Sequence, residues 1–405
     1  MKTIKGGITA AAGFKAAGIS SGIKKSGKKD LALIFSGIPA EAAGMFTSNK
    51  IKAAPILVSQ KQIKAGIAQA IIVNSGNANA CNGSRGLKDA EKIIAETAKA
   101  LGISRKKVLI ASTGSIGVPL PVEKIKKGIR ILSRNLSKKT GADAAKAILT
   151  TDTRPKEIAV ELKIKGKAVR IGGIAKGAGM INPNLTFGNH ATMLAFISTD
   201  ANIKSKALTK ALSEAVKDSF NMTTVDRERS TNDTVFALAN GMSGCREISE
   251  GTAEYTKFLE ALKYVCIYLA REIARDGEGA SKLIEVRVSG AKTAIDARRA
   301  AKIIAGSNLL KAAVFGGDPN WGRIMAALGY SGAQLNPDKI DVSIGNIAVV
   351  KSGKGVSFNR AGAKKHLKGR EVIIKVNLNL GKHKAKAWGC DLSYGYVRIN
   401  ARYHT

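Results

Sequence analysis

The chain has 405 residues, 44% of them hydrophobic and 5% aromatic, and 66 Lys and Arg outnumber 30 Asp and Glu to give a net charge of +36. This length and apolar content can bury a large core in one big domain or two ordinary ones. The longest apolar runs are too short to span a bilayer and no apolar run follows Met1, so we expect a cytoplasmic protein without a membrane segment or secretory signal.

The positive charge is spread along the chain, in lysine pairs that extend from Lys24-Lys25 to Lys364-Lys365. A nucleic-acid-binding protein concentrates such charge on one face and usually adds exposed aromatic side chains. We therefore expect a lysine-coated surface that attracts anionic metabolites, with neither nucleic acid nor membrane as a partner.

Histidines and cysteines are few and lack the spacing of metal ligands or of a catalytic relay. This excludes a serine-histidine enzyme and a zinc site, so we expect no metal. The cysteines are expected to be reduced and mostly buried thiols, at Cys81, Cys245, Cys266 and Cys390.

The first half of the chain alternates between strands and helices. Apolar residues lie on one face of a helix over 87–101, and Gly102 is its natural stop. A polar loop, 74–83, follows the first of the buried strands. Strands are predicted at 68–73 and 108–111 and, as a hairpin around Lys165-Gly166-Lys167, at 158–164 and 168–171.

The second half continues in the same style. Helical spacing occurs over 207–220 and 258–274. Three segments alternate as strands with one polar face, at 283–288, 340–344 and 372–380. Helices mixed with partly amphipathic strands predict layers of sheet covered by helices.

The stretch from Lys176 to Asp200 contains a threonine, Thr192, that follows the small Ala191 and precedes the apolar segment 193–197. This order suits a residue whose own peptide bond is cut, because glycine and asparagine upstream let the backbone bend and alanine leaves the carbonyl open. A freed Thr192 would carry a hydroxyl nucleophile and an α-amine of pKa about 7.7–8.0, which can act as the general base. The same run of residues, 191–197, is also typical of the start of a buried strand.

Two polar runs follow predicted apolar elements in the first half. In the run 112–117, Thr113 and Gly114 can aim a hydroxyl and a backbone N–H at a developing oxyanion, although a plain glycine-rich turn has the same composition. The run 150–156 can hydrogen-bond an amide or carboxylate substrate, or it can simply be the turn that ends a helix.

Two further polar runs lie in the second half. The run 230–234 packs five short polar side chains before an apolar segment, as a site or a capping turn does. In the run 276–282, glycines on both sides of Glu278 are expected to leave its carboxylate accessible to a cationic ligand, the alternative being a solvated acidic turn.

Together these runs resemble the ornithine acetyltransferase family, the glutamate N-acetyltransferases of the cyclic arginine pathway, over essentially the whole chain. The resemblance implies a mixed α/β (α+β) fold, a layered helix–sheet–sheet–helix sandwich of the self-processing DmpA/ArgJ-like type. The segments that carry it include NSGNANACNG at 74–83, STGSIG at 112–117, TTDTRPK at 150–156, KGAGMINPN at 176–184, ATMLAF at 191–196, STNDT at 230–234, DGEGASK at 276–282, DPNWGR at 318–323 and YVRINARYHT at 396–405.

The resemblance also implies a mechanism. The precursor would cut itself between Ala191 and Thr192 into an α chain, 1–191, and a β chain, 192–405, that fold together and assemble as an α2β2 heterotetramer. Thr192 would take acetyl from N2-acetyl-L-ornithine and pass it to L-glutamate in a ping-pong cycle, with Thr113 and Gly114 as the oxyanion hole. No cofactor is implied, and acetyl-CoA is a co-substrate only if the enzyme is bifunctional. The substrate-binding positions are Thr150, Lys176, Thr192, Glu278, Asn400 and Thr405.

The chain departs from the family pattern where Thr186–His190 separates the Pro-Asn segment from Ala191. This insertion either loops out or shifts the scissile bond to Leu185-Thr186. A related self-cleaving aminopeptidase or amidohydrolase is the alternative function, and a basic nucleic-acid-binding protein with an inactive enzyme fold is a third.

Overall fold

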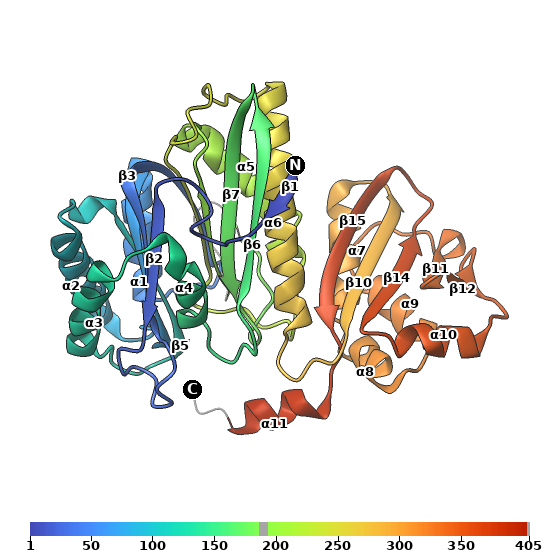
Figure 1. Ribbon diagram of the computed structural model, residues 1–405. Coiled ribbons are helices and arrows are strands. Elements are labelled where there is room, and N and C mark those ends of the chain that lie inside the picture. Colours follow the sequence, from blue (N-terminus) through green and yellow to red (C-terminus); the bar gives the residue numbers. More distant parts are fainter. Residues whose placement is uncertain (186–192, 403–405) are drawn as a thin grey trace.

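A computed structural model describes residues 1–185 and 193–402 of the chain. Within these residues, nine strands form one hydrogen-bonded sheet in the order β1-β6-β7-β8-β9-β3-β4-β5, with β2 paired to β3 off this path (Figure 1). The strands are β1 (Lys2–Ile4), β2 (Phe14–Ile19), β3 (Leu31–Phe46), β4 (Ile67–Asn77), β5 (Val108–Ser115), β6 (Lys156–Ile164), β7 (Lys167–Lys176), β8 (Leu194–Thr199) and β9 (Thr234–Ala239).

The long strand β3 joins two halves of this sheet. Its first part pairs with β2 and β4, its last part, Glu41 to Phe46, pairs with β9, and the register shifts between Phe35 and Ala40. The two halves face each other across one apolar core, in which Ile34 and Val73 share a cluster with Phe196 and Phe236. The nine strands therefore form two packed layers.

Helices cover the outer faces of both layers. On the β3-β4-β5 side, α2 (Gly83–Leu101) and α3 (Val122–Arg134) enclose a second apolar cluster, and on the β6-to-β9 side α5 (Ser205–Lys217) and α6 (Ala253–Arg275) enclose a third. The shorter helices are α1 (Ala54–Gln62) and α4 (Gly141–Ala147). The helix–sheet–sheet–helix sandwich expected from the resemblance is confirmed.

A second sheet of six strands lies beside the sandwich, in the order β13-β12-β11-β14-β10-β15 (Figure 1). Its strands are β10 (Leu283–Ala291), β11 (Asp341–Ile344), β12 (Ile347–Lys351), β13 (Lys354–Gly355), β14 (Glu371–Asn377) and β15 (His383–Cys390). The helices that accompany it are α7 (Ala294–Ala305), α8 (Asn308–Gly316), α9 (Trp321–Gly329) and α10 (Arg360–Leu367). After β15 the chain leaves this sheet and runs back toward the sandwich as α11 (Tyr394–Arg402).

Most predicted elements are present with shifted ends. The helix expected over 87–101 begins earlier, at Gly83, and ends at Leu101. Gly102 follows as its C-cap, with the left-handed φ of 65° that a glycine C-cap adopts. The loop expected over 74–83 is wrong at its start, because β4 continues to Asn77 through pairing with β5. No helix in the described part of the chain is long and apolar enough to cross a membrane.

Candidate active site

A pocket of about 100 Å³ lies where several strands of the sandwich end. Six residues singled out from the sequence meet there. They are Thr113, Gly114, Thr150, Lys176, Glu278 and Asn400, and the rest of the lining is Ile116, Thr151, Gly179, Met180, Ser230 and Asn232. The other predicted site residues, Ala191, Thr192 and Thr405, fall outside the described residues, as do both bonds considered for cleavage.

The buried end of β7 places Lys176 beside the end of β5. The Lys176 Nζ donates to the Thr113 hydroxyl across 3.4 Å, and the side chain is almost fully buried. Burial lowers the pKa of Lys176, and the Asp152 carboxylate opposes this shift. An anionic substrate group would favour the charged lysine, so this position suits a carboxylate.

Gly114 allows β4 and β5 to approach closely at the pocket. Its φ is 134°, and a Cβ placed on it would lie 2.3 Å from the Gly76 carbonyl carbon. Only glycine fits this position. The close pairing of the two strand ends fixes the backbone around Thr113, as a preorganised oxyanion site requires.

Asn232, two residues before β9, hydrogen-bonds to residues at the ends of other strands. Its Nδ2 donates to the Ala78 carbonyl at 2.6 Å and to the Ser112 carbonyl at 2.8 Å. The Ser112 hydroxyl in turn donates to Asn74 Oδ1 at 2.5 Å. The polar run 230–234 therefore does line a site. Asn232 itself had no role assigned to it from the sequence.

A buried ion network fixes the polar run 150–156. The Lys156 Nζ lies 2.7 Å from Asp152 Oδ1 and 2.6 Å from Asp276 Oδ2, and the side chains of Lys156 and Asp152 are fully buried. Burial alone would raise the pKa of Asp152, but the charges of Lys156 and Lys176 hold it well below its usual range. The same carboxylate accepts from the backbone N–H groups of Thr150 and Gly177 at 3.0 and 2.7 Å, so the network positions two walls of the pocket.

Glu278 is withdrawn from bulk solvent but lines the pocket, so its carboxylate faces the cavity and is not part of a solvated acidic turn. It is 9% exposed, and its Oε2 accepts from Asn400 Nδ2 at 2.8 Å. Gly179 packs against it so closely that a Cβ there would lie 2.3 Å from the carboxylate. Helix α11 therefore supplies a pocket residue from the end of the chain.

Asp233 is a buried carboxyl that the sequence analysis did not single out. It is fully buried, and neither of its oxygens has a hydrogen-bond partner in the described part of the chain. Burial raises its pKa well above the usual value, and Lys176 opposes the shift. In the β8–β9 register Leu194 lies opposite Thr234, and the Thr234 N–H donates to the Met193 carbonyl at 2.8 Å. Asp233 thus lies beside the residue that follows Thr192.

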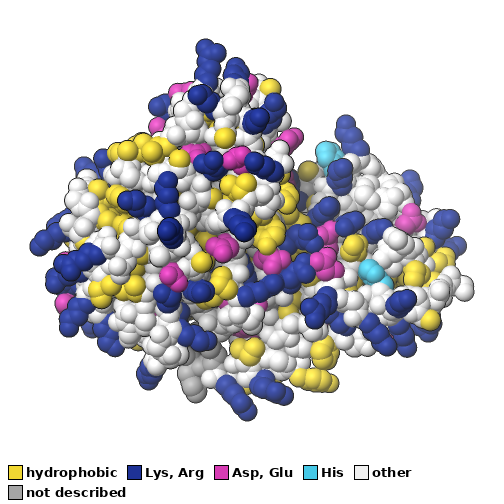
Figure 2. All heavy atoms as spheres, in the orientation of Figure 1, with side chains coloured by type: hydrophobic (Ala, Val, Ile, Leu, Met, Phe, Trp, Pro, Cys, Tyr) yellow, Lys and Arg dark blue, Asp and Glu magenta, His cyan; other side chains and the backbone are white. Residues whose placement is uncertain are grey.

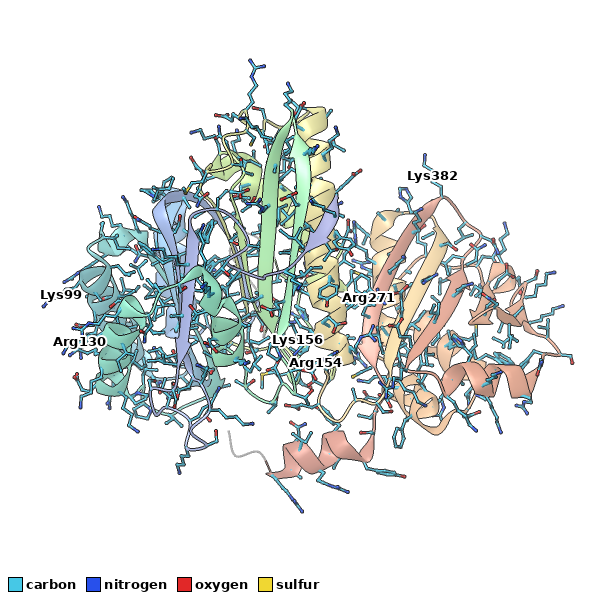
Figure 3. All side chains as sticks on the ribbon, viewed as in Figure 1. Lys99, Arg130, Arg154, Lys156, Arg271 and Lys382 are labelled. Atoms are coloured by element: carbon cyan, nitrogen blue, oxygen red, sulfur yellow. The ribbon has the colours of Figure 1, made fainter. Side chains whose placement is uncertain are left out.

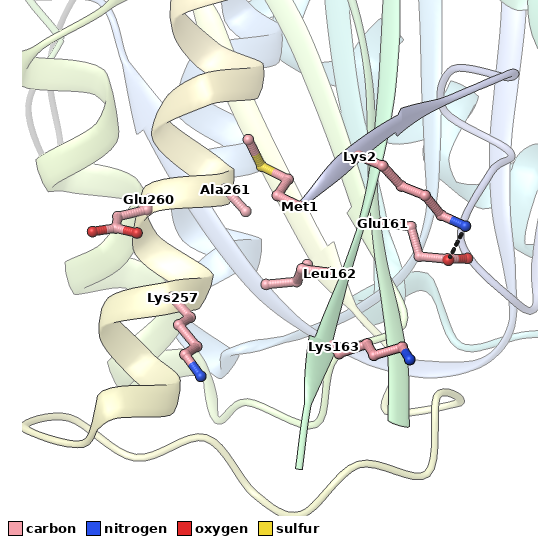
Figure 4. A pocket seen from close by; sticks show the side chains of 8 residues that line it. All are labelled: Met1, Lys2, Glu161, Leu162, Lys163, Lys257, Glu260 and Ala261. Atoms are coloured by element: carbon pink, nitrogen blue, oxygen red, sulfur yellow. Dashed lines mark ion pairs between the residues drawn. The ribbon is translucent and has the colours of Figure 1, made fainter. Parts of the chain in front are cut away.

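Other features lie away from this pocket. A larger pocket of about 550 Å³ is formed by β1, β6 and α6 around the Lys2–Glu161 ion pair and contains none of the predicted site residues (Figure 4). No cluster of three or more His, Cys, Asp or Glu residues suited to a metal ion occurs within 1–185 and 193–402. All four cysteines are free, and three are buried, with Cys81 exposed.

The fold and the pocket define a layered α/β protein with a small polar pocket at its strand ends. The chain belongs to the ArgJ family, whose model matches residues 15–405. It is thus an acetyltransferase of arginine biosynthesis. The "Arginine biosynthesis bifunctional protein ArgJ" of Symbiobacterium thermophilum is 52% identical over 407 residues and that of Caldanaerobacter subterraneus subsp. tengcongensis 49% over 409, each alignment covering 100% of both chains.

One solved structure, that of the bifunctional argJ protein from Bacillus halodurans, is 45% identical to the matching part of this chain with a TM-score of 0.50. The match covers 51% of this chain but 97% of the solved one. The solved chain is therefore about half as long.

Proposed function

We propose that this enzyme is a glutamate N-acetyltransferase that moves acetyl from N2-acetyl-L-ornithine to L-glutamate through an acetyl ester on Thr192. Membership of the ArgJ family supports the proposal. The observation that carries it is the meeting of Lys176 and Glu278, from either side of the proposed cleavage site, in one small pocket. A cation and a carboxylate facing one cavity match the carboxylate and ammonium groups of an amino-acid substrate.

The active form arises by self-cleavage between Ala191 and Thr192, which gives chains 1–191 and 192–405. Strand β8 pairs on one side with β7, which belongs to chain 1–191, and on the other side with β9, which belongs to chain 192–405. The shared sheet would therefore hold the two products together. The half-length solved chain of the relative from Bacillus halodurans supports this division.

In the proposed cycle, the Thr192 α-amine accepts the proton of its own hydroxyl while the hydroxyl oxygen attacks the acetyl carbonyl. Thr113 and Gly114 stabilise the negative charge on the carbonyl oxygen. The amine then gives the proton to the departing nitrogen of ornithine, which leaves an acetyl ester. The amine of glutamate attacks this ester and reverses the steps, so no cofactor takes part.

Each remaining residue has a binding role in this proposal. Lys176 pairs with a substrate carboxylate and Glu278 with the substrate ammonium. Thr150, Asn400 and Thr405 complete the contacts. The buried position of Glu278 strengthens its attraction for an ammonium, because solvent screens it less.

The proposal places the enzyme in the cytoplasm as an α2β2 assembly. Free cysteines are in keeping with a reducing compartment. The word "bifunctional" in the names of the relatives is the reason to propose acetyl-CoA as a second acetyl donor.

Mass spectrometry and N-terminal sequencing of the purified protein test the proposal, together with acetyl transfer measured with and without glutamate. We expect a new N-terminus at Thr192, acetylglutamate only when glutamate is present, and loss of both in Thr192→Ala. Rapid acetate release without glutamate would favour the aminopeptidase-like alternative. Salt-dependent retention on DNA without any acetyl exchange would favour the nucleic-acid-binding one.

A further inference from the structure

A second, larger pocket adjoins the candidate active site. It has a volume of about 640 Å³, which is in the range that holds a nucleotide-sized ligand. Its lining contains no Asp or Glu among the described residues. Six cationic side chains line it, from Lys217, Arg227, Arg229, Arg298, Arg299 and Lys302.

The charges in this pocket are poorly compensated from within the protein. The Arg229, Arg299 and Lys302 side chains donate to neutral oxygens, those of the Ser48 hydroxyl and the Gly332 and Pro183 carbonyls. Arg298 does bind a carboxylate, but Asp218 also pairs with Lys263 outside the pocket. The site therefore holds a net positive charge that a bound anion would neutralise.

The pKa of Lys302 reflects this excess of positive charge. Burial lowers its pKa to about 7, and the neighbouring Arg229 guanidinium lowers it as well. A cation held among other cations without a carboxylate is costly unless a ligand supplies the opposite charge.

Two chain segments form a wall between this pocket and the active site. Met180 and Ser230 face the active-site pocket, whereas Asn182 and Arg229 face the cationic one. Hydrogen bonds hold the segments together. Asn182 Nδ2 donates to the Arg227 carbonyl at 3.0 Å, and the Ile181 N–H donates to Asp226 Oδ1 at 2.9 Å.

We propose that the cationic pocket binds the phosphate groups of acetyl-CoA, so that its flexible thiol arm reaches over the wall to Thr192. This inference rests on the proposed function and assigns a location to the second acetyl donor. The active-site pocket, at about 100 Å³, is too small for the nucleotide part. Its neighbour also offers apolar surface from Met222 and Ile303 for a base.

The chemistry balances without any further reactant. The Thr192 hydroxyl oxygen forms a bond to the thioester carbonyl carbon and the carbon–sulfur bond breaks. The hydroxyl proton passes through the α-amine to the departing sulfur, which leaves as the thiol of coenzyme A. The same acetyl ester then serves both donors.

Steady-state kinetics with the two donors tests the proposal in the full, self-processed enzyme. We expect Arg299→Gln and Lys302→Gln each to raise KM for acetyl-CoA about tenfold, because each removes a charge-assisted contact to phosphate, and to leave KM for N-acetylornithine within about twofold. Inorganic pyrophosphate should compete with acetyl-CoA but not with N-acetylornithine.

Lys99→Gln and Arg130→Gln are the matched controls, since they remove the same charge from α2 and α3, far from the second sheet (Figure 3). Equal effects of pocket and control variants, or equal effects on both donors, would overturn the inference. So would an enzyme that transfers acetyl from N-acetylornithine but never from acetyl-CoA, although the proposed function would then stand. Loss of transfer from both donors in the unaltered enzyme would instead refute the proposed function.

Discussion

The sandwich and the six-stranded sheet bury their charges in different ways. Around the active-site pocket, the side chains of Asp152, Lys156, Lys176 and Asp233 are all buried within one group of strand ends and loops. In the second sheet the core is an apolar cluster. Its buried Glu285 accepts from the Trp388 indole and the Arg287 guanidinium at the side of that core.

This difference separates the catalytic region from the supporting one. Buried charges cost free energy unless they are paired, so their concentration at one pocket requires a reason. Chemistry on a charged substrate supplies that reason in the sandwich. The second sheet contributes to the site mainly through α11, which carries Asn400 to Glu278. Cationic side chains, by contrast, are spread over the whole visible surface of both regions (Figure 2).

Two fully buried lysines, one in each region, give the sharpest test of this comparison. Lys156→Met leaves the Asp152 and Asp276 carboxylates without their cation and should lower the free energy of unfolding by about 3–5 kcal/mol. Lys311→Met in α8 removes contacts with the Val225 carbonyl and the Cys390 sulfur, and should cost about 1–3 kcal/mol. Urea unfolding at pH 7 measures both, and equal losses would contradict the distinction.

Thr113→Ala, in the sandwich, should lower the acetyl-transfer activity of the enzyme rather than its free energy of unfolding. Loss of one oxyanion donor is expected to lower kcat for acetyl transfer by about 10²–10³-fold. Thr97→Ala removes another buried threonine hydroxyl, one that donates to the Ile93 carbonyl within α2, and should leave kcat unchanged. A kcat for Thr113→Ala within a few-fold of the unaltered enzyme would argue against the assigned oxyanion role.

Asp233→Asn should stabilise the uncleaved chain, which can be prepared as Thr192→Ala. Folding raises the pKa of Asp233. The contribution of this carboxyl to the free energy of unfolding is therefore complete below the unfolded pKa of about 3.9, and it is lost as pH rises through the folded pKa. Replacing the carboxyl should remove this fall and add about 1–2 kcal/mol at pH 7, with no difference below about pH 4. Urea unfolding at several pH values measures the gain, and a loss of stability at pH 7 would show that the carboxyl has a stabilising partner.

The smallest effect is expected for an exposed ion pair. The Arg130 Nε lies 3.0 Å from Glu96 Oε1, and the Arg130 side chain is 66% exposed. Arg130→Ala should change the free energy of unfolding by less than about 0.5 kcal/mol, because water and salt screen the pair. Thermal unfolding at low and high salt would measure it, and a loss comparable with that of Lys156→Met would remove the contrast between buried and exposed charge.

Local pattern was enough to predict most of the elements that carry the site. The strand at 68–73, the helix stopping at Gly102 and the hairpin around Lys165-Gly166-Lys167 all depend on periodicity and turn residues within short segments. The resemblance added the layered sandwich and the residues that now line one pocket. Their roles remain predictions, because Thr192 and Thr405 lie outside the described residues.

The strands, the helices and the polar runs at their ends follow from hydrophobic spacing and from glycine, which act within short segments. Packing of distant segments buries Glu278 against Asn400, leaves Asp233 without a partner among the described residues, and brings six cations together beside the pocket. Burial and electrostatic compensation depend on which distant segments pack together, and no short stretch of sequence contains that information.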